Sequence, residues 1–134
     1  MTVLIVEDTA ILRKVLRDIL GEFCGIQSDF IYEASDGVKA ISEYSRIQPN
    51  VVFLDINMPK LNGKDAIGQI LQVDPAARII MCTSSREEND VRECVLAGAK
   101  DYLIKPLQPQ RVKEALIKVT ADMDSKLLPE MLRG

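Results

Sequence analysis

The chain has 134 residues, of which 47% are hydrophobic, and carries a formal net charge of -3 at pH 7 with a sequence pI near 5.0. This length and composition suit one domain with a buried core, and the acidic balance argues against direct nucleic-acid binding, which needs a concentrated basic face. The chain has no histidine, so any imidazole chemistry must be supplied by another protein.

Membrane insertion and secretion are not indicated by the sequence. No apolar stretch approaches the roughly 20 residues that cross a bilayer, and Glu7 and Asp8 interrupt the N-terminal apolar run where a signal peptide would continue. We therefore expect a soluble, cytoplasmic protein. Cys24, Cys82 and Cys94 lack CxxC spacing, and we interpret them as reduced residues of the core.

Apolar runs of strand length alternate along the chain with segments of helical period, which is typical of a parallel sheet covered by helices on both faces. The expected strands are 3–6, 30–32, 51–54, 79–82 and 102–104. Apolar residues at helical spacing predict helices over 11–20, 38–44, 66–71, 91–95 and 112–119. Turn and end signals between them are Gly21, Asp36-Gly37, Pro49-Asn50, Asp74-Pro75, Gly98 and Gln108-Pro109.

Nothing in the sequence marks a domain boundary before about residue 121, because no repeat, low-complexity tract or Gly/Ser linker interrupts the order of elements. We predict one domain over residues 1–121 and a C-terminal extension over 122–134. Three roles stay open for the extension: packing on the domain, pairing with a second copy, or leading into a further domain. Its apolar residues are Leu127, Leu128, Met131 and Leu132.

Four of the apolar runs end in polar residues suited to phosphate chemistry. Glu7 and Asp8 follow the first run, Asp55 follows the third, Thr83 the fourth and Lys105 the fifth. The carboxyl ends of parallel strands meet at one edge of a sheet, where ligands bind in open α/β folds. We therefore expect these side chains to share one crevice.

The adjacent carboxylates of Glu7 and Asp8 repel each other, and a hard divalent cation such as Mg2+ would offset that repulsion. The alternative is that the aspartate caps the following helix. Asp55 favours the metal, because it ends a strand that would neighbour the first one and so adds a third carboxylate.

Asp55 itself is suited to nucleophilic attack on a phosphoryl group, the alternative being a metal ligand only. Lys105 offers an ammonium to Asp55 or to a phosphoryl oxygen, against the alternative of a plain surface lysine. Pro106 follows directly, and a tight X-Pro turn, with a cis bond as one option, would hold the lysine in place. Thr83 supplies a hydroxyl, or else caps a helix.

Taken together, these residues resemble the receiver domains of two-component response regulators over roughly residues 2–121. The matching features are Glu7-Asp8, EASDG at 33–37, DINMP at 55–59 followed by Gly63, Thr83, and AGAKDYLIKP at 97–106. The resemblance implies a flavodoxin-like, doubly wound (βα)5 fold with strand order 2-1-3-4-5.

The same resemblance implies a role for each matching residue. Asp55 would be the phosphoacceptor, and Mg2+ or Mn2+ would be bound by Glu7, Asp8, Asp55 and the main-chain carbonyl of Asn57. Lys105 and Thr83 would hold phosphoryl oxygens. Added phosphoryl charge is then the input of a two-state switch.

The resemblance also implies roles for Tyr102 and Ser85 and a second role for Asn57. The Tyr102 ring would change rotamer with Thr83 and remodel the surface of the fourth and fifth helices and the fifth strand, unless it is only a packed strand aromatic. Asn57 and Ser85 would flank the attacking water and tune dephosphorylation.

The implied function is that of a phosphoacceptor response regulator, not an enzyme with an independent substrate, since it would catalyse only its own phosphorylation and dephosphorylation. Its partners would be a sensor histidine kinase or a histidine phosphotransferase, and either a downstream protein or an output domain outside these 134 residues. A phosphorylation-dependent dimer is a further option.

Two rival functions differ in class. One is a degenerate receiver that serves as an interaction module without phosphotransfer, and the complete set of site residues argues against it. The other is a Mg2+-dependent aspartyl-phosphate hydrolase, which would need a second acidic residue where Asn57 stands.

Overall fold

In the computed structural model, which describes residues 1–56, 63–84 and 88–133, five parallel strands form one sheet. The strands are β1 (Val3–Val6), β2 (Ile31–Ala34), β3 (Val51–Asp55), β4 (Ile79–Thr83) and β5 (Asp101–Ile104). Their spatial order is β2-β1-β3-β4-β5. The predicted flavodoxin-like fold and strand order are thereby confirmed.

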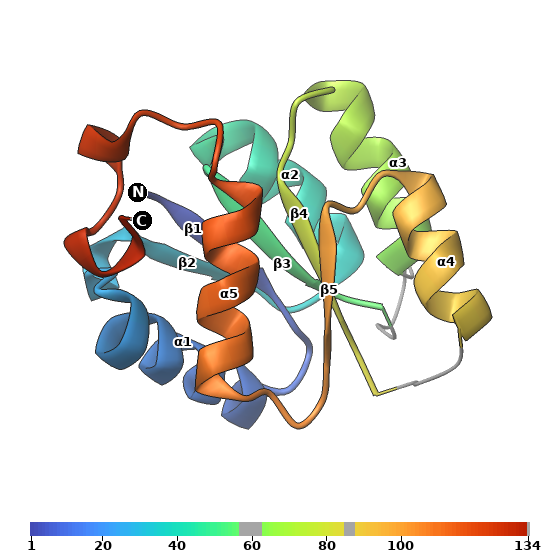
Figure 1. Cartoon of the computed structure of the whole chain (residues 1–134). Coiled ribbons are helices and arrows are strands. Elements are labelled where there is room, and N and C mark those ends of the chain that lie inside the picture. The colour runs from blue at the N-terminus through green and yellow to red at the C-terminus, as the bar shows by residue number, and fades with distance from the viewer. Residues whose placement is uncertain (57–62, 85–87, 134) are drawn as a thin grey trace.

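Helices cover both faces of this sheet (Figure 1). They are α1 (Ala10–Cys24), α2 (Gly37–Ile47), α3 (Gly63–Val73), α4 (Glu88–Ala97) and α5 (Pro109–Val119). α1 and α5 pack side by side on one face, whereas α2, α3 and α4 lie on the other. No helix in the described parts of the chain is long and apolar enough to span a membrane.

Each buried strand contributes to two hydrophobic cores, because successive side chains of a strand point to opposite faces. In β3, Val51 and Phe53 belong to the core under α1 and α5, and Val52 and Leu54 belong to the core under α2, α3 and α4. The continuous apolar runs in the sequence are therefore explained by a sheet that is buried on both sides.

The end of α1 differs from the prediction. Gly21 lies inside the helix, which continues to Cys24 and ends at Gly25 with a left-handed φ of 72°. The amide of Ile26 donates to the carbonyl of Leu20 at 3.0 Å, which closes the helix end. Cys24 is fully buried, so one more turn of α1 adds a residue to the core.

The start of β2 also differs. Phe30 belongs to a short 3-10 helix, η1 (Ser28–Phe30), and 45% of its surface is exposed. Its amide donates to the carbonyl of Gln27 at 2.9 Å, which turns the chain just before the strand. The strand pairing then begins with Ile31 opposite Val3.

The other turn signals lie where the sequence placed them. Asp36 caps α2 by accepting a hydrogen bond from the amide of Lys39 at 2.8 Å. Gly98 follows α4 with φ 119°, a conformation that favours glycine, and a Cβ there would also displace the side chain of Leu71.

The C-terminal extension folds back on the domain as two short 3-10 helices, η2 (Ser125–Leu127) and η3 (Glu130–Leu132). Leu128 and Leu132 join the core under α1 and α5, whereas Leu127 and Met131 are exposed by 60% and 45%. Of the three roles considered for the extension, packing on the domain accounts for the two buried leucines. The division at residue 121 stays a prediction.

Candidate metal and phosphoryl site

Three carboxylates meet at the carboxyl edge of the sheet. Glu7 and Asp8 follow β1, and Asp55 is the last residue of β3, the neighbour of β1. Carboxylate oxygens of all three lie within 4.8 Å of one another. Glu7 and Asp55 are buried and Asp8 is exposed, so the group opens to solvent on the Asp8 side.

Lys105 neutralises part of this negative charge. It follows β5, and its Nζ lies 2.7 Å from Oε1 of Glu7 and 3.4 Å from Oδ1 of Asp55. Burial by itself lowers the pKa of Lys105, but the hydrogen bond to Glu7 and the attraction of Asp55 and Glu7 outweigh it, so the pKa is raised. Lys105 is therefore a charged, ion-paired member of the site and not a free surface lysine.

Glu7 is fixed by contacts with four parts of the chain. Its amide donates to the carbonyl of Ala34 in β2 at 3.1 Å, and its Oε2 accepts from the amide of Thr9 at 3.0 Å. Its main-chain carbonyl accepts from Nη1 of Arg13 at 2.7 Å, and its Oε1 from Lys105. A carboxylate held at both oxygens has a defined direction.

The neighbours of Asp8 in the site shift the pKa of its carboxyl group. A side-chain hydrogen bond with Glu7, burial and the repulsion of the Glu7 charge raise the pKa of Asp8, and Lys105 acts in the opposite direction. Asp8 is not the cap of α1, because that helix begins at Ala10 with Thr9 at the N-cap position. The capping alternative is therefore wrong for this residue.

The donor set fits a hard divalent cation. The three carboxylates offer oxygen ligands only, and their mutual repulsion is offset when a cation binds. Glu7, Asp8 and Asp55 are the described residues that could hold such a cation together. The predicted fourth contributor, the carbonyl of Asn57, lies outside the described residues, as does Ser85.

Thr83 and Tyr102 lie on the two strands beyond Asp55. Thr83 is buried at the end of β4, one residue after Cys82, the pairing partner of Asp55. Its carbonyl accepts from the amide of Lys105 at 2.8 Å, so Thr83 is tied to the loop that carries the lysine. Thr83 is the last residue of β4 and the next residue, Ser84, is a bend and not the first residue of a helix, so Thr83 ends a strand.

Tyr102 is half-buried at the α4–β5–α5 side of the molecule. Its ring lies under the guanidinium of Arg111, whose central carbon is 5.9 Å from the ring centroid. The ring also packs against the core under α2, α3 and α4.

The Lys105-Pro106 peptide bond is cis, the option that the sequence left open.

Two sets of site neighbours were not anticipated from the sequence. Arg13 and Glu33 form an ion pair beside Glu7, and Arg111 binds buried Asp101 next to Tyr102. Glu33 lies inside the EASDG motif and Asp101 inside AGAKDYLIKP, and these motifs are the sequence features that could have pointed to the two acidic residues. No periodicity or spacing pairs either of them with its arginine.

Comparison with protein families identifies the same region of the chain as the site geometry does. The family model described as response regulator receiver domain matches residues 3–117, a range that contains the carboxylate group and Lys105. The chain belongs to this family, as the resemblance of its motifs predicted.

Among individual proteins, the chain is similar to the chemotaxis protein CheY of Thermotoga maritima, with 43% identity over 118 residues that cover 88% of this chain and 96% of that protein. It is also 40% identical to protein CcdB of Bacillus subtilis over 117 residues, or 87% of this chain and 95% of that one. The similarity therefore extends over nearly the full length of both relatives.

A solved structure shares the fold at comparable coverage. The crystal structure of the CheX-CheY-BeF3-Mg2+ complex from Borrelia burgdorferi matches with a TM-score of 0.80 and 31% identity, over 89% of this chain and 88% of that one. In that complex a CheY protein occurs together with Mg2+ and a beryllium fluoride group.

Proposed function

We propose that this receiver domain accepts a phosphoryl group on Asp55 and transmits the change to a partner protein. The observation that carries the proposal is the ion-paired group at the sheet edge: Asp55 and Glu7 share Lys105, at 3.4 and 2.7 Å, with Asp8 alongside. A nucleophilic carboxylate, a set of metal ligands and a cation for phosphoryl oxygens thus lie within a few ångströms of one another.

Glu7, Asp8 and Asp55, with the main-chain carbonyl of Asn57, are proposed to bind Mg2+ or Mn2+, which supplies neutralisation of phosphoryl charge. The support is the all-oxygen donor set and the presence of Mg2+ in the related CheY complex. The chain's own contribution is to hold these carboxylates together against their repulsion.

In the proposed transfer, a carboxylate oxygen of Asp55 attacks the phosphorus of a phosphohistidine on another protein. The new P–O bond forms as the P–N bond breaks, and the histidine nitrogen leaves with the bonding electron pair. Lys105 can then exchange its contact with the Asp55 carboxylate for one with a phosphoryl oxygen. The donor is a sensor histidine kinase or a histidine phosphotransferase, since this chain has no histidine.

The output is proposed to be a change of the surface formed by α4, β5 and α5. Thr83 is tied through its carbonyl to the Lys105 loop, and Tyr102 lies on the adjacent strand beside Arg111 of α5. Movement of Thr83 toward a bound phosphoryl group would be passed to Tyr102 and from there to a protein partner, with a second copy of the chain as one option. The related CheY was solved bound to CheX, which shows one such partner for that protein.

On this proposal, the chain turns over no independent substrate and catalyses only its own phosphorylation and the hydrolysis of the product. Asn57 and Ser85 remain the proposed determinants of the hydrolysis rate. Exchange of either residue is expected to change the decay of phosphorylated protein without preventing its formation.

The direct test is intact-mass spectrometry of the chain after incubation with acetyl phosphate, with and without Mg2+, beside the Asp55→Asn variant. We expect one phosphoryl adduct that requires Mg2+ and is absent from the variant. Beryllofluoride with Mg2+ serves as a second probe, because it mimics the bound phosphoryl group without covalent chemistry. Absence of any adduct would favour the interaction module, and an adduct on the variant would show that Asp55 is not the acceptor.

A further inference from the structure

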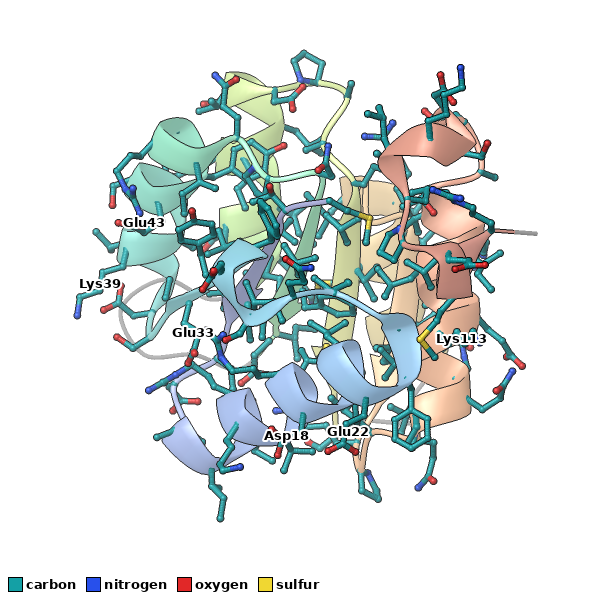
Figure 2. All side chains as sticks on the ribbon, turned by 90° about the vertical axis from the view of Figure 1, so that its left-hand side faces the viewer. Asp18, Glu22, Glu33, Lys39, Glu43 and Lys113 are labelled. Carbon is teal, nitrogen blue, oxygen red and sulfur yellow. The ribbon has the colours of Figure 1, made fainter. Side chains whose placement is uncertain are left out.

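Arg13, in the first turn of α1, makes a contact that the sequence did not suggest. Its Nη1 donates to the main-chain carbonyl of Glu7 at 2.7 Å, and its Nε donates to Oε1 of Glu33 at 2.9 Å. The Arg13 side chain is 19% exposed, so both bonds are partly shielded from water. Figure 2 shows Glu33 beside the N-terminal half of α1.

The carbonyl of Glu7 has structural importance because it belongs to the peptide bond that leads into Asp8. A peptide unit is planar, so a fixed carbonyl direction also fixes the amide and Cα of the next residue. The preceding peptide is held as well, by the bond from the Glu7 amide to the carbonyl of Ala34 at 3.1 Å. Both peptide planes around Glu7 are therefore restrained, and with them the starting point of the Asp8 side chain.

The turn into α1 has little other support from side chains. Thr9 is the N-cap residue, but its side chain makes no capping hydrogen bond. The bond from the Thr9 amide to Oε2 of Glu7 at 3.0 Å depends on the same carboxylate that faces Lys105. Arg13 thus supplies a restraint on this turn that does not involve a carboxylate of the metal site.

Arg17, one turn further along α1, provides an internal comparison. It also pairs with Glu33, at 2.7 Å from Oε2, and it binds the carbonyls of Ser28 and Ile31. Its hydrogen bonds within the described residues reach β2 and η1, whereas those of Arg13 reach β2 and Glu7. The two arginines share a helix and a counter-ion and differ in their contact with the site.

We propose that Arg13 is a positioning residue for the metal site: by binding the carbonyl of Glu7, it orients the Glu7-Asp8 peptide so that both carboxylates face one cation. The assignment rests on the metal binding proposed above. Outer-shell hydrogen bonds of this kind orient ligands elsewhere, and their loss typically weakens metal affinity about 10- to 100-fold.

The charge of Arg13 alone predicts the opposite change in metal affinity. Arg13 is a cation next to a cation-binding site, so removing it makes the local potential more negative and should tighten metal binding. A loss of affinity on removal of Arg13 therefore cannot arise from its charge. The Arg17 variant measures how much the loss of one positive charge on α1, or a general weakening of this helix, changes the metal affinity.

The experiment is a Mn2+ titration followed by electron paramagnetic resonance of the free ion, with Mg2+ competition, on the whole chain. The proteins are wild type, Arg13→Met and Arg17→Met, since methionine keeps the apolar stem of arginine and removes every donor. We expect Arg13→Met to bind Mn2+ about 10-fold more weakly and Arg17→Met to bind as tightly as wild type or slightly more tightly. Urea unfolding of each variant checks that it is folded.

The Mn2+ titration can also be done with lysine variants. Arg13→Lys and Arg17→Lys both keep the charge, so only the geometry of the donors changes. If Arg13→Met fails to fold, weaker Mn2+ binding by Arg13→Lys than by Arg17→Lys supports the proposal, and equal binding overturns it.

The outcomes separate the two levels of inference. A wild-type chain that binds neither Mn2+ nor Mg2+ contradicts the proposed metal site, and the role of Arg13 falls with it. A wild-type chain that binds Mn2+, together with equal affinities in Arg13→Met and Arg17→Met, contradicts the positioning role and leaves the metal site standing.

Discussion

Asp8 lies in an environment that disfavours its charged form in the absence of a cation. Three causes raise its pKa: a side-chain hydrogen bond with Glu7, the partial burial of Asp8 itself, and repulsion by the Glu7 charge. The only ammonium among the described contacts of the group, that of Lys105, is bonded to Glu7 and Asp55. A carboxylate kept close to others for ligand binding is expected to lower the stability of the metal-free fold.

We predict that Asp8→Asn stabilises the metal-free protein at pH 7 by up to about 1 kcal/mol, a small value because the position is exposed to solvent. The folded pKa of Asp8 is raised, so its charge is unfavourable above that pKa and the cost disappears as the pH falls below it. Thermal unfolding in EDTA should show a higher Tm for the variant at pH 7 and converging values toward pH 4.

The same melts with saturating Mg2+ should reverse the order, because only the wild type retains its full ligand set. Asp18→Asn is the control, since Asp18 lies on α1, is exposed and pairs with Lys14 at 2.9 Å. Its loss should leave Tm unchanged or slightly lower. An Asp8→Asn Tm at or below that of wild type in EDTA would contradict the prediction.

Among the elements, the C-terminal extension shows how a short segment becomes part of a core. η3 lies against α1 and α5 at the amino ends of the strands, next to the N-terminus (Figure 1). Leu132 is 2% exposed and Leu128 is 8% exposed. Nε of Arg133 donates to the carbonyls of Ser125 and Leu128, at 3.0 and 3.2 Å, which closes the extension on itself.

We predict that Leu132→Ala destabilises the chain by about 2 kcal/mol, at the low end for buried leucine because the segment is peripheral. Leu127→Ala is the matched control, since Leu127 is 60% exposed and should change stability by less than about 0.5 kcal/mol. Urea midpoints give both values. Equal midpoints for the two variants would show that the extension does not contribute to the core.

Metal binding provides the second readout for this element. The extension lies at the amino ends of the strands, whereas Glu7, Asp8 and Asp55 stand at the carboxyl ends of β1 and β3. Mn2+ affinity should therefore be the same in Leu132→Ala and wild type at low urea.

At the scale of the whole molecule, one sheet separates two hydrophobic cores that share the same five strands. Cys24 and Cys82 lie in the core under α1 and α5, and Cys94 lies in the core under α2, α3 and α4. Burial raises the pKa of Cys24 to about 11 and that of Cys82 to about 12. Both are therefore protonated and shielded at neutral pH, as expected for reduced core thiols.

We predict that all three thiols resist alkylation in the native protein and become reactive at one common urea midpoint, because strands shared by both cores make unfolding cooperative. Pulsed iodoacetamide labelling with peptide mass spectrometry reports each cysteine separately. Alkylation of Cys94 at lower urea than Cys24 would instead mean that α4 opens independently of the α1 side.

The sequence by itself determined the sheet and the main members of the site. Buried strands on a parallel sheet are apolar on both faces, so their approximate positions could be predicted from the apolar runs, and a polar residue directly after a run had to lie at the carboxyl edge. Glu7, Asp55 and Lys105 were therefore predictable as neighbours, although 98 residues separate Glu7 from Lys105.

Local signals failed where the sequence is compatible with two conformations. Gly21 and Gly25 are both compatible with a helix end, and the choice fell to Gly25 because one more turn buries Cys24. Phe30 has strand propensity, but a 3-10 turn before β2 places it half in solvent. The choice of Gly25 depends on the packing of Cys24 in the core under α1 and α5.

Only the tertiary structure decided which cations serve which anions and which leucines are buried. Arg13 reaches the carbonyl of Glu7 and Arg17 does not, although both lie on α1 and both bind Glu33. Leu132 is buried and Leu127 is exposed on the same short extension. Periodicity along the chain defines the face of an element, whereas the partner of a side chain is set by the position of other elements in space, which local sequence does not encode.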